Sequence, residues 1–256
     1  MRLGICTAPE KAQLVKKAGF DFYEFQVFQV HDADEEQYNK WLDLQQKAGI
    51  PCEAMNVMLP PRILITGFSV DQAQIKDYLE KAVKRCAKMG AKIIVFGSAR
   101  SRNMPDGFWD RKKAYEQIVE YLRIASDICG KYEINIVIEP LGAPVANIVN
   151  FVAEGNYLCH LTDRKNVRLL ADLYAVSLNH ENCQEALVGY ASSMEHLHFC
   201  APDRKYPRRD DGWDYSDFFN GVKRSGFDKR ISVEASHTGD EYEDMAEAME
   251  VFRKYL

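Results

Sequence analysis

Four apolar runs in this sequence end in or near a side chain that can bind a cation or move a proton. Glu139 follows the run NIVI, Asp172 ends VRLLAD, His198 lies in MEHLHF, and Glu234 follows RISV. Three carboxylates brought together repel one another, and each is costly in an apolar setting unless a partner compensates its charge. A divalent cation is a natural partner for such a set. We therefore predict that Glu139, Asp172, His198 and Glu234 form one metal site.

The chemical types of these side chains restrict which metal ions the site could bind. Carboxylate oxygens with one imidazole suit Mn²⁺, Mg²⁺, Co²⁺ or Zn²⁺, and the lack of sulfur argues against a structural zinc site. His196 alternates with His198 on one strand face, so we expect it one layer deeper, as a hydrogen-bonded core histidine. The alternative is a cavity of ion pairs without a metal, in which the carboxylates pair with Arg100, Arg102 or Arg204.

The elements that would position these side chains alternate between strands and helices. Continuous Val/Ile runs are typical of parallel strands covered by helices. The sequence predicts strands over residues 2–7, 22–27, 52–59, 92–98, 135–141, 167–174, 194–200 and 230–236. It predicts helices over residues 9–18, 34–48, 71–89, 110–131, 147–161, 180–190, 214–225 and 240–255, with Asn147 as a cap of the fifth.

Eight strand–helix units in 256 residues favour one α/β domain, a (β/α)8 TIM barrel spanning residues 1–256. No low-complexity stretch or linker divides the chain. Active sites of such barrels lie at the carboxyl ends of the strands. The spacings between the four candidates, 33, 26 and 36 residues, correspond to about one unit each. Consecutive strands would therefore direct the four side chains to one point.

Composition excludes several classes of protein. The net charge of −5 and the absence of a basic stretch argue against nucleic acid as a partner. No apolar run has the length of a membrane span, and the first residues do not read as a signal peptide. Seven cysteines occur singly without a CxxC pair, which indicates reduced thiols and a cytoplasmic location. We expect a small-molecule partner and leave homo-oligomerisation open.

Several of these runs carry a family resemblance that extends over nearly the whole chain. The matching stretches are IEPL at 138–141, LAD at 170–172, HLH at 196–198, VE at 233–234 and the loop 97–108. In these the chain resembles the sugar phosphate isomerase/epimerase family with the xylose isomerase-like barrel, which includes ketose 3-epimerases and inosose dehydratases. The resemblance implies a divalent metal, usually Mn²⁺, held by Glu139, Asp172, His198 and Glu234.

The resemblance also implies a reaction. The two glutamates, Glu139 and Glu234, would be the acid and base on opposite faces of a keto sugar or sugar phosphate, and the metal would stabilise an enediolate. A carboxylate suits this work when its pKa is tuned toward the working pH. Arg204 matches an arginine that contacts substrate oxygens in relatives. Its alternative role is a solvated charge at the rim.

Three further residues are candidates for substrate binding. Arg102 would bind a phosphate or carboxylate through its guanidinium, Trp109 would stack on the sugar, and His237 would bind phosphate at the start of the last helix. The alternatives are a solvated rim for Arg102, rim packing for Trp109, and simple capping of the last helix by Asp240. Glu24, inside the second strand, could face the pocket, but we expect it to pair with a loop arginine.

The sequence departs from the family pattern at two positions. Relatives carry Asp-x-x-His after strand six, where this chain has Ala175, and a glutamate where it has Val145. Tyr174 is a candidate to replace the missing hydrogen bond. The departures leave open an inosose-type dehydratase on the same metal site and a non-catalytic sugar-binding protein. A DNA-repair endonuclease fits poorly, because such relatives use several zinc ions and many histidines, and this chain has six.

Overall fold

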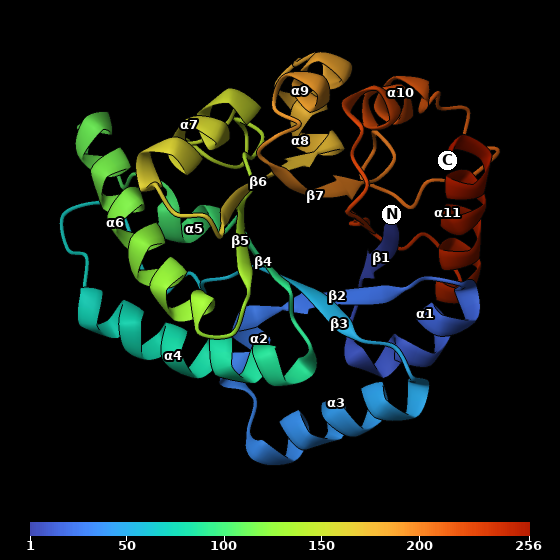
Figure 1. The fold of residues 1–256 in the computed structure, drawn as a ribbon, viewed down its shortest axis with the longest axis horizontal. Helices are drawn as coiled ribbons and strands as arrows, with labels where there is room; N and C mark the ends of the chain where they lie inside the picture. The colour runs from blue at the N-terminus through green and yellow to red at the C-terminus, as the bar shows by residue number, and fades with distance from the viewer.

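A closed barrel of eight parallel strands forms the centre of the protein (Figure 1). The computed structural model describes residues 1–256. The strands are β1 (Arg2–Cys6), β2 (Phe22–Gln26), β3 (Cys52–Asn56), β4 (Ile93–Phe96), β5 (Asn135–Ile138), β6 (Val167–Asp172), β7 (Met194–Phe199) and β8 (Arg230–Val233). Each strand pairs with the next, and β8 closes onto β1 with Ile231 opposite Leu3. The prediction of an α/β fold with a (β/α)8 barrel is confirmed.

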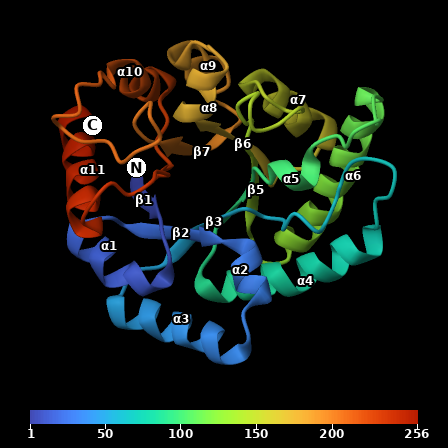
Figure 2. The same cartoon turned by 180° about the vertical axis from the view of Figure 1, so that it is seen from behind.

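Helices surround the barrel on its outside, as Figures 1 and 2 show from opposite sides. The helical elements are η1 (Pro9–Lys11), α1 (Ala12–Ala18), α2 (Val27–Asp32), α3 (Glu35–Ala48), α4 (Gln72–Met89), α5 (Ala99–Arg102), α6 (Arg111–Gly130), α7 (Val152–Thr162), α8 (Leu173–Leu178), α9 (Cys183–Gly189), α10 (Ser216–Ser225) and α11 (Glu241–Tyr255). The short helices α2, α5 and α8 were not predicted. None of the helices is long and apolar enough to cross a membrane.

The helix predicted over residues 147–161 begins later than expected, at Val152. Asn147 does not cap it. Its side chain instead accepts from the Met104 N–H at 2.9 Å and donates to the Met104 carbonyl at 2.9 Å. Glu154 stabilises the true helix start by accepting from the Asn150 N–H at 2.6 Å. The segment between β5 and α7 is therefore a loop, tied to the loop after β4 at the carboxyl end of the barrel.

The barrel interior has an apolar floor. Six fully buried side chains form a cluster separate from the larger core under the helices: Phe22, Ala54, Ile93, Val95, Val137 and Leu170. Gly4 is needed beside this floor, because a Cβ there would lie 2.2 Å from the ring of Phe22. The ring centroids of His196 and Phe22 lie 6.5 Å apart. The His196 side chain therefore packs directly on this apolar cluster, which leaves it little room to move toward the amino ends of the strands.

Candidate metal centre and active site

The four predicted ligands all lie at the carboxyl ends of neighbouring strands. Glu139 directly follows β5, Asp172 ends β6, His198 is the fifth residue of β7, and Glu234 directly follows β8. The parallel register places Asp172 opposite His198. Residues far apart in the sequence thus converge, because successive strands of a barrel end on the same rim.

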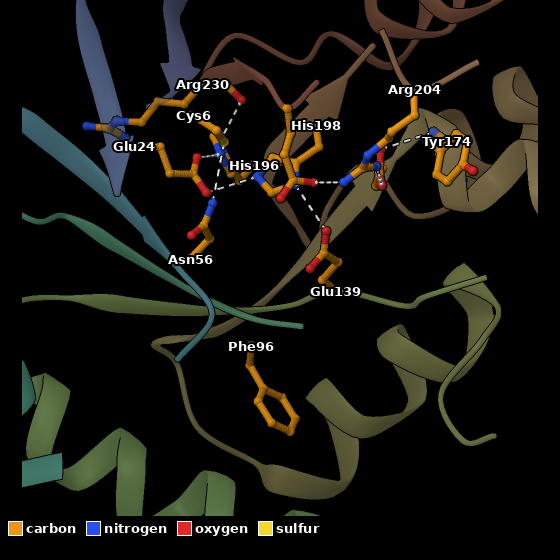
Figure 3. A network of polar contacts seen from close by, with 12 residues as sticks. Cys6, Glu24, Asn56, Phe96, Glu139, Tyr174, His196, His198, Arg204 and Arg230 are labelled. Carbon is orange, nitrogen blue, oxygen red and sulfur yellow. Dashed lines mark hydrogen bonds and ion pairs between the residues drawn. The ribbon is translucent and has the colours of Figure 1, made fainter. Parts of the chain in front are cut away.

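Three of the four side chains, those of Glu139, His198 and Glu234, come together, and Figure 3 shows the Glu139 carboxylate directed toward the His198 ring. His198 Nδ1 lies 3.0 Å from Glu139 Oε1 and 3.3 Å from Glu234 Oε2. All three atoms lie within 4.8 Å of one another. Two carboxylate oxygens and an imidazole nitrogen at such separations can converge on one cation with modest adjustment.

Asp172 lies beside this group, but its oxygens face other partners. Its Oδ2 accepts from Arg204 Nη1 at 2.9 Å, and its Oδ1 accepts from the Tyr174 N–H at 3.0 Å. Arg204 also donates through Nη2 to Glu234 Oε2 at 2.5 Å. Burial raises the pKa of Asp172 to about 6, although Arg204 opposes that rise. Ligation by Asp172 stays a prediction.

A buried carboxylate, Glu24, orients the histidine. Glu24 Oε1 lies 3.1 Å from His198 Nε2, and Glu24 Oε2 lies 2.9 Å from His196 Nε2. The expectation that Glu24 pairs with a loop arginine is wrong, because its side chain points into the barrel, where both histidines reach it. A hydrogen bond from His198 Nε2–H to Glu24 fixes the ring with Nδ1 toward Glu139 and Glu234, as carboxylates do behind metal-bound histidines.

His196 is a hydrogen-bonded core histidine one layer deeper, as predicted. Its Nδ1 lies 3.1 Å from the Arg230 carbonyl oxygen, and its ring is fully buried. Its two nitrogens face the Arg230 carbonyl oxygen and a Glu24 carboxylate oxygen, and burial lowers the pKa of the ring. Burial alone would raise the pKa of Glu24, but His198 and His196 hold it well below its usual range.

The charges of the site favour a cation. Burial would lower the pKa of His198, yet Glu24 and Glu234 raise it well above its usual value. Burial would raise the pKa of Glu234, but His198 and Arg204 lower it to about 2. The carboxylates thus draw positive charge to the end of the barrel, and His198 and Arg204 supply it here, as the alternative of an ion-paired cavity expects. The donor set and its charge fit a divalent metal held through oxygen and nitrogen.

Gly97 makes room for one of the candidate ligands. A Cβ at this position would lie 2.0 Å from Glu139 Oε2 and 3.2 Å from Glu139 Cδ. Any other residue would push the Glu139 carboxylate away from its place. Glycine at the end of the strand-four run thus has a site function that the sequence alone did not reveal.

Two cavities that share three lining residues open above the cluster, and we treat them as two lobes of one cavity. One lobe, of about 310 Å³, lies against the loops after β5 and β6, and we call it the β5–β6 lobe. The other, of about 370 Å³, lies against β1, β2 and β3, and we call it the β1–β3 lobe. Both lobes share Asn56, Arg204 and Glu234. Their sizes lie in the lower part of the range for small-molecule sites.

A larger hollow, of about 820 Å³, lies on the outside of the barrel between α6 and α7. Arg111, Tyr115 and Tyr157 are among its lining residues. None of the predicted site residues is among them. Because the ionisable cluster lies elsewhere, we place the chemistry in the smaller, two-lobed cavity.

Among the predicted substrate-binding residues, Tyr174 and Arg204 line the β5–β6 lobe. The Arg204 guanidinium carbon lies 4.8 Å from the centroid of the Tyr174 ring. Arg204 adopts a left-handed backbone conformation with φ 66°. Residues other than glycine hold such a conformation at a cost of about 1–3 kcal/mol, and such strain clusters at functional sites.

The prediction that Arg102 binds substrate is wrong. Its side chain is fully buried, with 0% of its surface exposed. Its guanidinium donates to the carbonyl oxygens of Phe96 at 3.1 Å, Glu139 at 2.8 Å and Val149 at 3.0 Å. Arg102 therefore fixes the backbone on both sides of the Glu139 loop and does not face the cavity.

Trp109 and His237 lie outside the lining of both lobes. Trp109 is 83% exposed. His237 stacks on Tyr206 with ring centroids 4.5 Å apart, and its Nδ1 lies 3.3 Å from Asp244 Oδ2. Asp240 caps α11 by accepting from the N–H groups of its first turn. Neither Trp109 nor His237 would therefore contact a ligand in the cavity.

The comparisons with known proteins agree with this fold. Residues 12–255 match the family described as xylose isomerase-like TIM barrel, so the chain belongs to that family. A probable ketose 3-epimerase from Synechocystis sp. (strain ATCC 27184 / PCC 6803 / Kazusa) is 23% identical over 167 residues, which cover 64% of this chain and 56% of that protein. The chain thus matches little more than half the length of this relative.

Two solved structures share the architecture. A D-psicose 3-epimerase determined in the presence of D-fructose superimposes with a TM-score of 0.87 at 17% identity, covering 100% of this chain and 99% of the other. The 3-keto-D-glucoside 4-epimerase YcjR from E. coli superimposes with a TM-score of 0.83 at 17% identity, covering 99% of both chains. At these identities the likeness shows the fold alone.

Proposed function

We propose that this protein is a divalent-metal-dependent epimerase or isomerase of a keto sugar or sugar phosphate. The observation that carries the proposal is the pair of glutamates that flank one histidine nitrogen from different strands. Glu139 meets His198 through Oε1, and Glu234 meets it through Oε2. The second oxygen of each carboxylate, Oε2 of Glu139 and Oε1 of Glu234, is left for a substrate proton.

The residues that would hold the metal are Glu139, His198 and Glu234, joined by Asp172 once Arg204 turns to the substrate. Mn²⁺ is the proposed ion, with Mg²⁺, Co²⁺ and Zn²⁺ as the other candidates for an O/N donor set. When bound, the cation would polarise the substrate carbonyl and stabilise the charge of an enediolate.

The two glutamates divide the proton transfers. With its pKa lowered to about 2, Glu234 is ionised at neutral pH and can accept the proton beside the carbonyl, although so low a pKa makes it a weaker base than a carboxylate tuned toward the working pH. Glu139, on the other side of His198, would return a proton to the opposite face and so invert that carbon. Arg204 would hold a substrate oxygen, because its guanidinium reaches both lobes of the cavity. The epimerases among the similar proteins support this choice of substrate class.

The test is a panel of ketoses incubated in D₂O with the Mn²⁺-loaded protein. Nuclear magnetic resonance should show deuterium bound to the carbon beside the carbonyl, together with the inverted sugar. Glu139→Gln and Glu234→Gln should each abolish incorporation, whereas the exposed Glu36→Gln on α3 should leave it unchanged. Incorporation that survives in both site variants would sink the assignment. Loss of water from an inosose would point to the dehydratase instead.

A further inference from the structure

The two lobes of the cavity differ in polarity. The wall of the β1–β3 lobe carries polar side chains, including Thr7, Gln26, Gln29 and Ser236. The β5–β6 lobe has Ser98, Asp172 and Tyr174 among its polar lining residues, but its wall on the side of the loops after β5 and β6 also contains Leu141, Gly142, Val145, Ala175 and Leu178, and none of these five has a polar side chain. A ligand hydroxyl would therefore find partners in the first lobe and none among these five residues of the second.

The shared boundary between the lobes contains an unpaired acceptor. Asn56 is 6% exposed, and its Oδ1 has no hydrogen-bond partner. Its Nδ2 lies 3.5 Å from Cys6 Sγ, which is a weak acceptor. Buried polar atoms are almost always paired. A hydroxyl donated by a bound ligand would satisfy Asn56 Oδ1.

Glu234 and Arg204 line both lobes and Glu139 lines the β5–β6 lobe, so a reacting group between the two glutamates lies next to the same boundary. A substrate held there extends into both lobes. Its two ends therefore meet different surroundings, a polar one on the side of β1 and β2 and an apolar one on the side of the loops after β5 and β6.

We propose that the site selects a keto sugar that is polar at one end and apolar at the other. Its hydroxyls lie in the β1–β3 lobe, where Asn56 Oδ1 accepts one of them. Its other end, in the β5–β6 lobe, is deoxygenated or alkylated. The inference rests on the proposed function for the position of the reacting carbon, and it names the substrate class of that site.

Binding of three sugars to the Mn²⁺-loaded protein, measured by calorimetry, tests the proposal. The probes are D-fructose and its 1-deoxy and 6-deoxy analogues, because removing either terminal hydroxyl makes one end apolar. We expect one deoxy analogue to bind roughly tenfold to a hundredfold more tightly than D-fructose, the range in which apolar pockets discriminate against an added hydroxyl. Equal affinities, a preference for D-fructose, or no binding of any of the three would overturn the proposal.

Variants assign the preference to the two lobes. Val145→Thr with Ala175→Ser adds two hydroxyls to the apolar wall at nearly constant volume, and we expect it to reduce the preference at least severalfold. Val188→Thr on α9, outside both lobes, is the matched control and should leave the preference unchanged. If the double variant keeps the full preference, the apolar wall is not its source.

Asn56→Leu removes the acceptor at similar size. We expect roughly tenfold weaker binding of all three sugars, with thermal unfolding reporting that the fold persists. Unchanged affinity would remove Asn56 from the proposal. Because calorimetry requires no turnover, selective binding without deuterium incorporation would refute the proposed function alone. Turnover with equal affinities for the three sugars would refute this inference alone.

Discussion

Replacing Gly97 by alanine is the smallest change that should disable the site while sparing the barrel. The new Cβ would lie 2.0 Å from Glu139 Oε2, whereas real contacts of this kind are not shorter than 3.0 Å. The carboxylate must therefore retreat by roughly 1 Å, since carbon and oxygen cannot overlap so deeply. The oxygen displaced is the one that we assign to proton transfer.

The expected loss follows from that displacement. A misplacement of about 1 Å in a reacting group costs roughly 10²-fold in turnover, which corresponds to about 2.7 kcal/mol of activation free energy. Mn²⁺ should also bind more weakly, because Glu139 Oε1 turns with Oε2. The free energy of unfolding of Gly97→Ala should differ little from that of the parent protein. Gly97 does not have a left-handed φ, and the group that must move is the end of a side chain.

The assay is deuterium incorporation into a ketose by Gly97→Ala, with calorimetric Mn²⁺ binding and thermal unfolding on the same preparation. Gly189→Ala on α9 is the matched control, because a Cβ there meets nothing within 4 Å. The control should match the parent protein in all three measurements. If Gly97→Ala keeps full incorporation and full Mn²⁺ affinity, the reasoning about the position of Glu139 is refuted.

Three other predictions concern buried charged residues. Glu24→Gln should weaken Mn²⁺ binding by roughly 10–100-fold, as losing the carboxylate behind a metal-bound histidine does, and calorimetry that finds unchanged affinity would contradict this. Arg102→Leu should lower the free energy of unfolding by more than about 3 kcal/mol, because three buried carbonyl oxygens lose their donor; an unchanged urea midpoint would count against it. Burial would raise the pKa of Asp244, but hydrogen bonds from Thr238 and His237 lower it. The stability that Asp244 contributes is thus present above its unfolded pKa of about 3.9 and is lost as the pH falls through its lower folded pKa. Urea midpoints at pH 7 and pH 3 should therefore differ less in Asp244→Asn than in the parent, and an equal pH dependence would refute the assignment.

The sequence was sufficient to predict the barrel because each strand is a compact apolar run with its own pattern. All eight strands lie where predicted, with ends that differ by a few residues. The short helices α2, α5 and α8 were missed because four to six residues do not span two helical turns. The start of α7 was misplaced because Asn147 bonds across to Met104 in another loop, a contact that no local pattern reveals.

The sequence predicted the part of the site that depends only on which residues end the strands. Glu139, His198 and Glu234 meet because parallel strands deliver their last residues to one rim. The pairing of Glu24 with two histidines depends on which layer of the barrel each side chain occupies. The burial of Arg102 depends on the direction in which α5 turns. Neither the pairing of Glu24 nor the burial of Arg102 can be inferred from the presence of a charged residue in a strand or loop.

Anomalous diffraction from crystals soaked in Mn²⁺ would show whether Glu139, His198 and Glu234 bind one divalent cation. We expect a single anomalous peak about 2.0–2.3 Å from Glu139 Oε1, His198 Nδ1 and Glu234 Oε2, the separations typical of metal–oxygen and metal–nitrogen bonds. We also expect Asp172 to turn from Arg204 toward the same peak. A well-ordered crystal in which the three side chains contact only one another, with Mn²⁺ elsewhere or unbound, would show that these residues are not a metal site.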